Sequence, residues 1–555
     1  MNDPRWASID AFAEQNRDAV LRDITRLVAV PSVEGTPEPG APFGAGPKAA
    51  LDKALEIAAE LGLHTYNADG YIGWADTAPI AEGQKFLATI THTDVVPEGN
   101  GWDADPYTVR VRDGWLLGRG VADDKGPSIL CLYALKYLKD SGIVLRYPVR
   151  ALLGANEETH MHDVDYYAKH YPMPAFCFTP DAEFPVCNGE KGGFSGELVS
   201  HALNGVILDF QGGVAINAVP DRAFCVVNVP ADRLTPAEGI TLEAGEQPGT
   251  TVIRGWGKSG HAAMPAGTVN AIGLIVCYLL DSGICTEAEN AYLQVLRTLH
   301  ADTDGTALGI AADDGLFDPL TVVGGTIRMK DGVIRQTFDC RYPTNTNPET
   351  MSAAVRKVCG DAAALENVSS RVPFYIAADS PAIQTLIHTY NDVTGEGKTP
   401  FTMGGGTYAR HFPYAVSFGP EHTDLPLPEF AGPMHGANEG ANFDKLIEAL
   451  KIYILALLRL QEIELYNNSP ASLGKRGCFL YFTIRSKFHA AVVQRNIPAV
   501  LPVSAAAQGG DQSKNPARHN QNCQNSAKMF HIAALPVRTC YFSIYTIPQE
   551  TPGCK

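Results

Sequence analysis

Long hydrophobic runs and an excess of positive charge are both missing from this chain of 555 residues. No uninterrupted apolar stretch approaches the roughly 18 residues of a membrane-spanning helix, so we expect no membrane-embedded part. Lysine and arginine number 44 against 61 aspartates and glutamates, which gives a net charge of −17. We therefore expect no nucleic-acid or membrane partner, because broad binding to either needs a basic face.

Closely spaced cysteine pairs and an N-terminal leader pattern are absent as well. The twelve cysteines include no Cys-x-x-Cys pair, which argues against a disulfide framework and against a zinc ribbon. The first fifteen residues do not have the charged and then apolar pattern of a signal peptide. We therefore expect a cytoplasmic protein of globular composition whose thiols are free and mostly buried.

The length predicts more than one domain, and the charge is unevenly distributed along it. The segment 466–555 has 10 basic and 2 acidic residues, whereas the chain before it carries a net charge of −25. Apolar residues recur with helical spacing from Phe443 to Leu458, and this regular pattern then stops. We predict a folded unit of about 465 residues, followed by a basic, disordered or adventitious tail over 466–555.

Three apolar runs of buried-strand type stop at histidine or carboxylate residues. The runs and the residues that follow them are 86–91 with His92 and Asp94, 149–154 with Glu157 and Glu158, and 175–179 with Asp181. A glycine-bounded loop that carries Asp123 lies between the first two runs and opens a helix. Helices between strands predict an α/β unit with a largely parallel sheet, in which functional groups gather beyond the carboxyl ends of the strands.

Imidazole and carboxylate donors without thiolate suit zinc, manganese or cobalt at a catalytic site. Several carboxylates close together would repel one another, so we expect two divalent cations rather than an acid dyad. In extended backbone Asp94 points the same way as His92 and could orient its ring. Glu157 and Glu158 would point oppositely, which lets one bind metal while the other acts as a general base. Each motif alone also fits an ordinary turn or helix start; their combination favours the metal site.

Seven motifs make the sequence similar to a known family over about residues 10–460. They are HTDVVP at 92–97, GRGVADDKGP at 118–127, NEET at 156–159, TPDAEFPV at 179–186, NGEKG at 188–192, GGGTYAR at 404–410 and HGANE at 435–439. With them the chain resembles the clan MH co-catalytic zinc metallopeptidases, the group of aminoacylase, carboxypeptidase G and carnosinase. The closest resemblance is to the bacterial dipeptidase V type, the Xaa-His dipeptidases.

The resemblance implies a di-metal catalytic α/β sandwich with an inserted α+β lid domain. The catalytic domain would comprise residues 1–192 and 379–465, and the lid residues 193–378. Half-buried strand patterns near 223–229 and 321–328 agree with such an insertion. The size of the lid is that of family members whose lid completes the active site within one chain, so we expect a monomer.

Carried over to this sequence, the family pattern makes Asp123 the ligand shared by both metals and the residue before a cis peptide bond. His92 and Asp181 would complete one ligand set. Glu158 and His435 would complete the other. Glu157 would be the general base and Asp94 the residue that braces His92.

The same resemblance assigns the substrate site. A neutral donor from the lid, His261 or Asn217, would donate a hydrogen bond to the developing oxyanion. Arg410 would grip a free C-terminal carboxylate, and the glycines before it, including Gly405, would let the backbone approach the substrate. We expect His160 and His162, which follow Glu158 closely, to lie outside the metal ligands.

These assignments predict a metal-dependent dipeptidase. It would hydrolyse unblocked dipeptides with a water molecule between two divalent metal ions, most readily zinc, with manganese or cobalt as alternatives. A second candidate is an amidohydrolase, deacylase or carboxypeptidase that acts on N-acyl amino acids. A third is a non-catalytic scaffold, which the presence of Glu157 and all five ligand residues disfavours.

Overall fold

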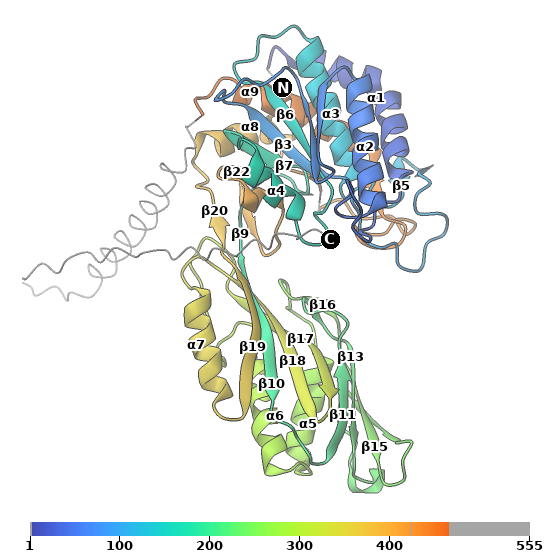
Figure 1. Cartoon of the computed structure of the whole chain (residues 1–555), viewed down its shortest axis with the longest axis vertical. Coiled ribbons are helices and arrows are strands. Elements are labelled where there is room, and N and C mark those ends of the chain that lie inside the picture. The colour runs from blue at the N-terminus through green and yellow to red at the C-terminus, as the bar shows by residue number, and fades with distance from the viewer. Residues whose placement is uncertain (1–2, 423, 466–555) are drawn as a thin grey trace, which may run out of the picture. The chain divides into compact units, whose positions relative to one another are not determined.

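The computed structural model describes residues 3–422 and 424–465, and these form two large β-sheets with their helices (Figure 1). The predicted tail 466–555 lies outside the described residues. Among the described helices, none has the length and apolar character needed to cross a membrane. The eight cysteines in this part of the chain are all free, and six of them are buried, as expected.

The first sheet has nine strands among the described residues. In spatial order they are β1 (His64–Ala68), β2 (Ile72–Asp76), β6 (Val149–Gly154), β3 (Leu87–His92), β7 (Phe176–Thr179), β22 (Ala415–Ser417), β9 (Cys187–Glu190) and β20 (Phe374–Tyr375), with β21 (Phe401–Met403) paired to β9. The four central strands β6, β3, β7 and β22 are parallel, so their carboxyl ends meet at one edge.

The sheet is mixed rather than largely parallel, which corrects the prediction. Strands β1 and β2 form an antiparallel hairpin, and β2 also pairs with β6 in antiparallel register. The hairpin turn contains Asp69 and Gly70, both with positive φ. An Asp-Gly pair of this conformation joins antiparallel strands in a tight turn, and the sequence prediction did not use it.

Helices cover both faces of the first sheet, and the central strands are therefore buried on both sides. One face carries α1 (Trp6–Val28), α2 (Ala45–Glu60), α3 (Lys125–Asp140), α8 (Pro381–Thr394) and α9 (Phe443–Leu460). The other face carries α4 (His162–His170) and the short helix η2 (Tyr408–His411), and α4 is seen in front of the sheet in Figure 1. Alternate residues of β3 serve the two cores, Leu87 one and Ala88 the other. The α/β sandwich is thus confirmed.

The second sheet has eight antiparallel strands, again among the described residues. In spatial order they are β14 (Ile240–Ala244), β15 (Thr251–Trp256), β13 (Arg222–Val227), β11 (Ile207–Gly212), β17 (Thr321–Lys330), β18 (Val333–Tyr342), β10 (Gly192–Ser200) and β19 (Ala363–Arg371). Its core also contains α5 (Ala271–Ser282), α6 (Glu287–Leu299) and α7 (Pro348–Cys359), while η1 (Ala231–Arg233) is a single short turn.

Local sequence signals fix where these helices begin. Asn270 accepts hydrogen bonds from the first backbone amides of α5, and Asn347 does the same for α7, whose first residue is a proline. Thr286 and Glu289 form a reciprocal capping box at the start of α6. Side-chain oxygens at these positions satisfy amides that the first helical turn leaves unpaired.

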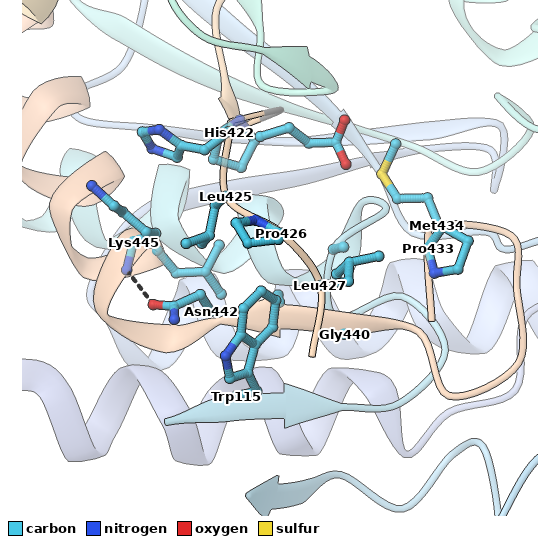
Figure 2. Close-up of a pocket in the computed structure, with 15 residues that line it drawn as sticks. Trp115, His422, Leu425, Pro426, Leu427, Pro433, Met434, Gly440, Asn442 and Lys445 are labelled. Carbon is cyan, nitrogen blue, oxygen red and sulfur yellow. Dashed lines mark hydrogen bonds between the residues drawn. The ribbon is translucent and has the colours of Figure 1, made fainter. Parts of the chain in front are cut away.

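Three small ribbons complete the described part of the fold. They are β4 (Arg110–Arg112) with β5 (Trp115–Leu117) and β24 (Gly440–Asn442), β8 (Ala182–Glu183) with β23 (Pro420–Glu421), and β12 (Ala218–Val219) with β16 (Gly260–His261). A cavity of about 520 Å³ lies beside the first two, and Trp115, Leu427 and Met434 are among the residues that line it (Figure 2).

Candidate metal centre

The predicted ligands meet at the carboxyl edge of the first sheet. His92 is the last residue of β3, and Asp181 follows β7 by two residues. Glu158 follows β6, the neighbour of β3 on its other side. Adjacent parallel strands bring their carboxyl ends together, which places groups from distant parts of the sequence at one site.

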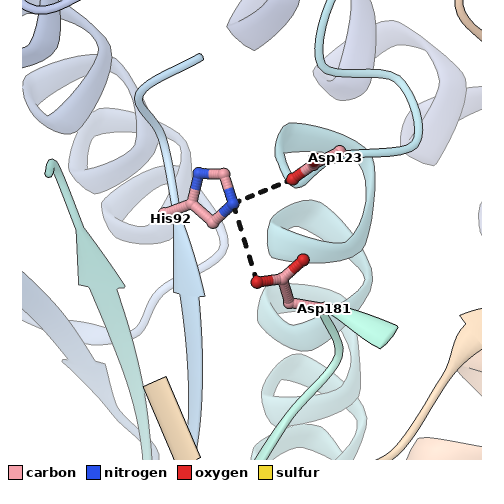
Figure 3. Close-up of side chains that lie close together, drawn as sticks. All are labelled: His92, Asp123 and Asp181. Atoms are coloured by element: carbon pink, nitrogen blue, oxygen red, sulfur yellow. Dashed lines mark hydrogen bonds and ion pairs between the residues drawn. The ribbon is translucent and has the colours of Figure 1, made fainter. Parts of the chain in front are cut away.

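Two groups of ligand atoms form there, and they share Asp123. The first group is His92, Asp123 and Asp181, and the second is Asp123, Glu158 and His435; within each group the ligand atoms lie within 4.8 Å of one another. In the first group, His92 Nε2 lies 2.9 Å from Asp123 Oδ1 and 3.9 Å from Asp181 Oδ2 (Figure 3). In the second, His435 Nε2 lies 2.8 Å from Asp123 Oδ2 and 3.2 Å from Glu158 Oε2. The two oxygens of Asp123 therefore face different groups.

The loop that carries Asp123 is held by a residue that the sequence analysis quoted but did not assign. Glu439 is fully buried, and its Oε1 accepts hydrogen bonds from the backbone amides of Gly120, Ala122 and Asp123 at 3.0–3.2 Å. Its Oε2 lies 2.6 Å from the guanidinium of the equally buried Arg119. The Asp123–Asp124 peptide is cis, as the resemblance implied.

Asp94 contacts His92 differently from the prediction. Strand β3 ends at His92, so Asp94 is outside the extended register that was assumed. His92 Nδ1 lies 3.0 Å from the backbone carbonyl of Asp94 and 3.5 Å from its carboxylate. That carboxylate accepts hydrogen bonds from the amides of Glu157 and Glu158 at 3.2 and 3.1 Å. Asp94 therefore links β3 to the turn that carries the two glutamates, and these lie in a turn rather than in extended backbone.

A second buried carboxylate, which the sequence analysis did not identify, also binds the turn that carries Glu157 and Glu158. Asp163 Oδ2 accepts hydrogen bonds from the amides of Ala155 and Asn156 at 2.7 and 3.0 Å, and also from the hydroxyl of Tyr408. Burial raises the pKa of Asp163 to about 6. The turn is thus held between Asp94 and Asp163.

The pKa values of the clustered side chains indicate a site that attracts positive charge. Burial, together with the charge of Asp181, raises the pKa of Glu157 well above its usual range. Burial and the charge of Asp123 do the same to Asp181. His435 responds in the opposite direction, since hydrogen bonds to Asp123 and Glu158 raise its pKa to about 11. Crowded oxygen donors that draw positive charge, with two imidazoles among them, fit two divalent cations.

The lid candidates lie together on the β12–β16 ribbon. His261 pairs with Ala218, and the carbonyl of Asn217 accepts a hydrogen bond from Ala262 N at 2.9 Å. His261 Nδ1 accepts a hydrogen bond from Ala263 N at 3.2 Å, so the neutral ring carries its proton on Nε2. Desolvation, with the charge of Arg341, lowers the pKa of His261. A neutral ring with an exposed N–H donor results.

The Arg410 side chain is bound by other residues of the protein. Its Nε lies 2.7 Å from Oε2 of the fully buried Glu190, and its Nη2 donates to the carbonyl of Lys191 at 3.1 Å. The space beside Gly405 is open, because an added Cβ there would meet only Met403, at 3.8 Å.

Two further arginines lie at the glycine segment, residues 404–406, and the sequence analysis did not single them out. Arg341 is held by both oxygens of Asp339 and donates to the carbonyl of Gly404 at 3.2 Å. A Cβ added at Gly406 would lie 3.3 Å from Cζ of Arg371. The Arg371 side chain forms no hydrogen bond or ion pair with any residue that the structure describes. Desolvation, with the charges of Arg410 and Arg341, lowers its pKa to about 10.

His160 and His162 belong to neither ligand group of the described residues. Their rings lie 5.3 Å apart, beside the turn that follows Glu158.

Comparison with known proteins agrees with this geometry. Residues 88–459 match the model of peptidase family M20/M25/M40. The chain is 32% identical over 469 residues to the putative dipeptidase YtjP of Bacillus subtilis, which covers 80% of this chain and 98% of the relative. It is also 32% identical over 474 residues to the Beta-Ala-Xaa dipeptidase of Lactobacillus delbrueckii subsp. lactis, covering 82% and 98%.

A solved structure shows the same fold at much lower sequence identity. Human carnosine dipeptidase 1 superposes with a TM-score of 0.52 at 15% identity, and the match covers 83% of this chain and all of that one. The family match spans most of the described chain and includes every residue of the two ligand groups. The chain therefore belongs to peptidase family M20/M25/M40 and is a peptide-bond hydrolase.

Proposed function

We propose that this chain is a metal-dependent dipeptidase that hydrolyses unblocked dipeptides. The observation that carries the proposal is the carboxylate of Asp123 shared by two ligand groups, with Glu157 on the turn beside them. Two relatives that match over nearly their whole length are named dipeptidases, which favours this function over the hydrolysis of N-acyl amino acids.

His92, Asp123 and Asp181 would hold one divalent cation, and Asp123, Glu158 and His435 the other. When bound, such cations polarise a carbonyl group and lower the pKa of water. Zinc suits two imidazoles and several carboxylates, and manganese or cobalt would also suit them.

Glu157 would act as the general base. Its carboxylate is raised in pKa by burial and by neighbouring acids, and such a group takes up a proton more readily than an exposed glutamate does. It would accept a proton from the attacking water and pass it to the leaving amine. Asp94 and Asp163 would keep Glu157 in place through the turn that they bind.

His261 and Asn217 would stabilise the oxyanion. The Nε2 proton of His261 is free to donate because Nδ1 is occupied by Ala263 N. A neutral donor supplies a hydrogen bond to developing negative charge without a proton transfer.

The C-terminal carboxylate of the dipeptide would bind at the glycine segment around Gly405. Arg410, Arg341 and Arg371 bring three guanidinium groups there, while Glu190 and Asp339 neutralise two of them. One positive charge is left for the substrate, and a charge-assisted pair of this kind selects free acids.

The second sheet, with α5, α6 and α7, would be the inserted lid, and one chain would complete the site. A Cβ added at Gly404 would lie 2.8 Å from the Cβ of Ala263 in the same chain, so the His261 segment approaches the glycine segment without a partner subunit.

A panel of substrates tests the proposal. The zinc-loaded enzyme is expected to hydrolyse Ala-Ala, and to act far more slowly on acetyl-Ala-Ala and on Ala-Ala-Ala. Faster hydrolysis of the acetylated substrate would instead favour an N-acyl amino acid hydrolase.

A further inference from the structure

A carboxylate that has no partner among the described residues lines the 520 Å³ cavity beside the metal centre. Glu421 ends the short strand β23, and its side chain forms no hydrogen bond or ion pair within residues 3–422 and 424–465. Its neighbour across the ribbon is another acid, because Glu421 pairs in register with Glu183 of β8. Burial, with the charge of Asp123, raises the pKa of Glu421 to about 7.

The cavity adjoins both ligand groups. Ala122 and Met434 in its wall directly precede the ligands Asp123 and His435. Strand β8, which pairs with the Glu421 segment, begins one residue after the ligand Asp181. When the scissile bond of a substrate lies at the ligand groups, the residue next to that bond can therefore reach this cavity.

The cavity is mostly apolar and offers little other charge. Trp115, Leu425, Pro426 and Met434 form its walls (Figure 2). The one lysine in its lining, Lys445, is already paired, since its Nζ lies 2.8 Å from Glu448 Oε1.

Among the described residues, no cation pairs directly with Glu183 or Glu421. His435 is the cation that acts on Glu421 from a distance, and its ring is held by Asp123 and Glu158 at 2.8 and 3.2 Å. Lys398 is the cation that acts on Glu183, yet its Nζ lies 2.9 Å from Glu396 and 3.3 Å from Asp424. Glu421 is also outside both ligand groups of the described residues, so the expected metal ions do not engage it directly. An apolar recess with one uncompensated carboxylate fits a small organic cation.

We propose that Glu421 binds an ammonium group of the substrate's amino-terminal residue. This assignment rests on the proposed dipeptidase function and gives its requirement for an unblocked substrate a physical cause. An acetylated substrate would leave the carboxylate buried and unpaired, which opposes binding. The ammonium comes from the α-amino group or from the side chain of an amino-terminal lysine.

Glu421→Gln tests the proposal, because it removes the charge and keeps the shape. The matched control is Glu429→Gln, an exposed acid of the same segment that does not line the cavity. For each zinc-loaded enzyme, kcat/KM is measured with Ala-Ala, Lys-Ala and acetyl-Ala-Ala. Binding of Ala-Ala is measured by calorimetry in the Glu157→Gln background, where turnover is slow.

Loss of a charge-assisted bond is expected to reduce kcat/KM for Ala-Ala by about 10- to 100-fold and to weaken calorimetric binding by a similar factor. The rate with acetyl-Ala-Ala should change little, and Glu429→Gln should match the parent. A loss confined to Lys-Ala would assign the side-chain ammonium as the ligand.

Equal losses with the free and acetylated substrates, or no loss with any, would overturn the assignment. Failure of the dipeptidase proposal looks different, since the parent enzyme itself would then hydrolyse acetyl-Ala-Ala faster than Ala-Ala, or would hydrolyse none of the three substrates.

Discussion

Asp123 would make the metal centre binuclear, because each of its carboxylate oxygens lies within 2.9 Å of a different imidazole. Glu157 is the neighbouring acid that belongs to neither ligand group. The two adjacent glutamates thus have different surroundings, and the proposed general base, Glu157, is the one whose loss should leave both ligand groups intact.

Replacing Glu157 by glutamine should therefore separate chemistry from metal binding. We expect Glu157→Gln to keep two metal ions per chain while kcat falls by about 10²- to 10⁴-fold, since general-base catalysis contributes that much. Elemental analysis and steady-state kinetics on the same preparation check this. Loss of one metal ion from Glu157→Gln, with two retained in Glu158→Gln, would exchange the roles assigned to these glutamates.

The arginines at the glycine segment should differ when they are replaced. Arg371→Gln should raise KM for Ala-Ala about tenfold or more and reduce the preference for Ala-Ala over its C-terminal amide. Its melting temperature should be unchanged, because this guanidinium has no hydrogen bond or ion pair to lose among the described residues. Arg410→Gln should also weaken carboxylate binding, but it leaves Glu190 buried without its partner and should destabilise the fold by about 3–5 kcal/mol. Equal acid and amide preferences in parent and variants would contradict this carboxylate site.

The sequence motifs named the residues that form the two candidate ligand groups, but not the residues that surround them. The Asp94 carboxylate lies 3.5 Å from the His92 ring that it was expected to brace, and it also binds two amides of the Glu157 turn, which was not expected. Extended geometry was assumed for a residue that lies beyond the end of its strand. Arg371 has no motif at all, and only the folded chain brings it to Gly406.

Among the elements, short apolar runs ending in polar residues were the strongest signal. The run 149–154 is β6 residue for residue, and the helix expected from Phe443 is α9. Both elements are largely buried, so their apolar patterns are regular. The hairpin of β1 and β2 was missed because its antiparallel direction depends on the two turn residues Asp69 and Gly70.

A buried histidine in the core beside the second sheet should make the stability of the fold depend on pH. His300 follows α6 and is packed against Gly273 and Gly324, and burial lowers its pKa to about 4. Because the folded pKa is below the unfolded value of about 6.5, the unfolded chain binds more protons between these values, and stability is lost as pH falls from 6.5 towards 4.

His300→Leu should remove this part of the acid sensitivity. Urea unfolding at pH 7 and at pH 4.5 should show a smaller fall in the free energy of unfolding for the variant, by about 2–3 kcal/mol. The other titrating groups are shared by both proteins and cancel in the comparison. An identical fall in the free energy of unfolding of both proteins would mean that protonation of His300 does not destabilise the fold.

For the whole molecule, the described core ends shortly before the predicted tail. Leu465 is buried, and its carbonyl accepts a hydrogen bond from Lys85 at 2.6 Å. A chain that ends at Asn467 keeps all of these contacts, so we expect the melting temperature and kcat/KM of the full chain. A large drop in either quantity would make the segment 468–555 part of the enzyme.

The proposed dipeptidase function requires two divalent cations bound around Asp123. Its most direct test is to remove all metal with a chelator, add zinc back stepwise, and follow the release of alanine from Ala-Ala. We predict no activity in the metal-free chain and a rise that reaches its plateau at two zinc ions per chain. Full activity without metal, or a plateau at one ion with no second ion bound, would contradict the account.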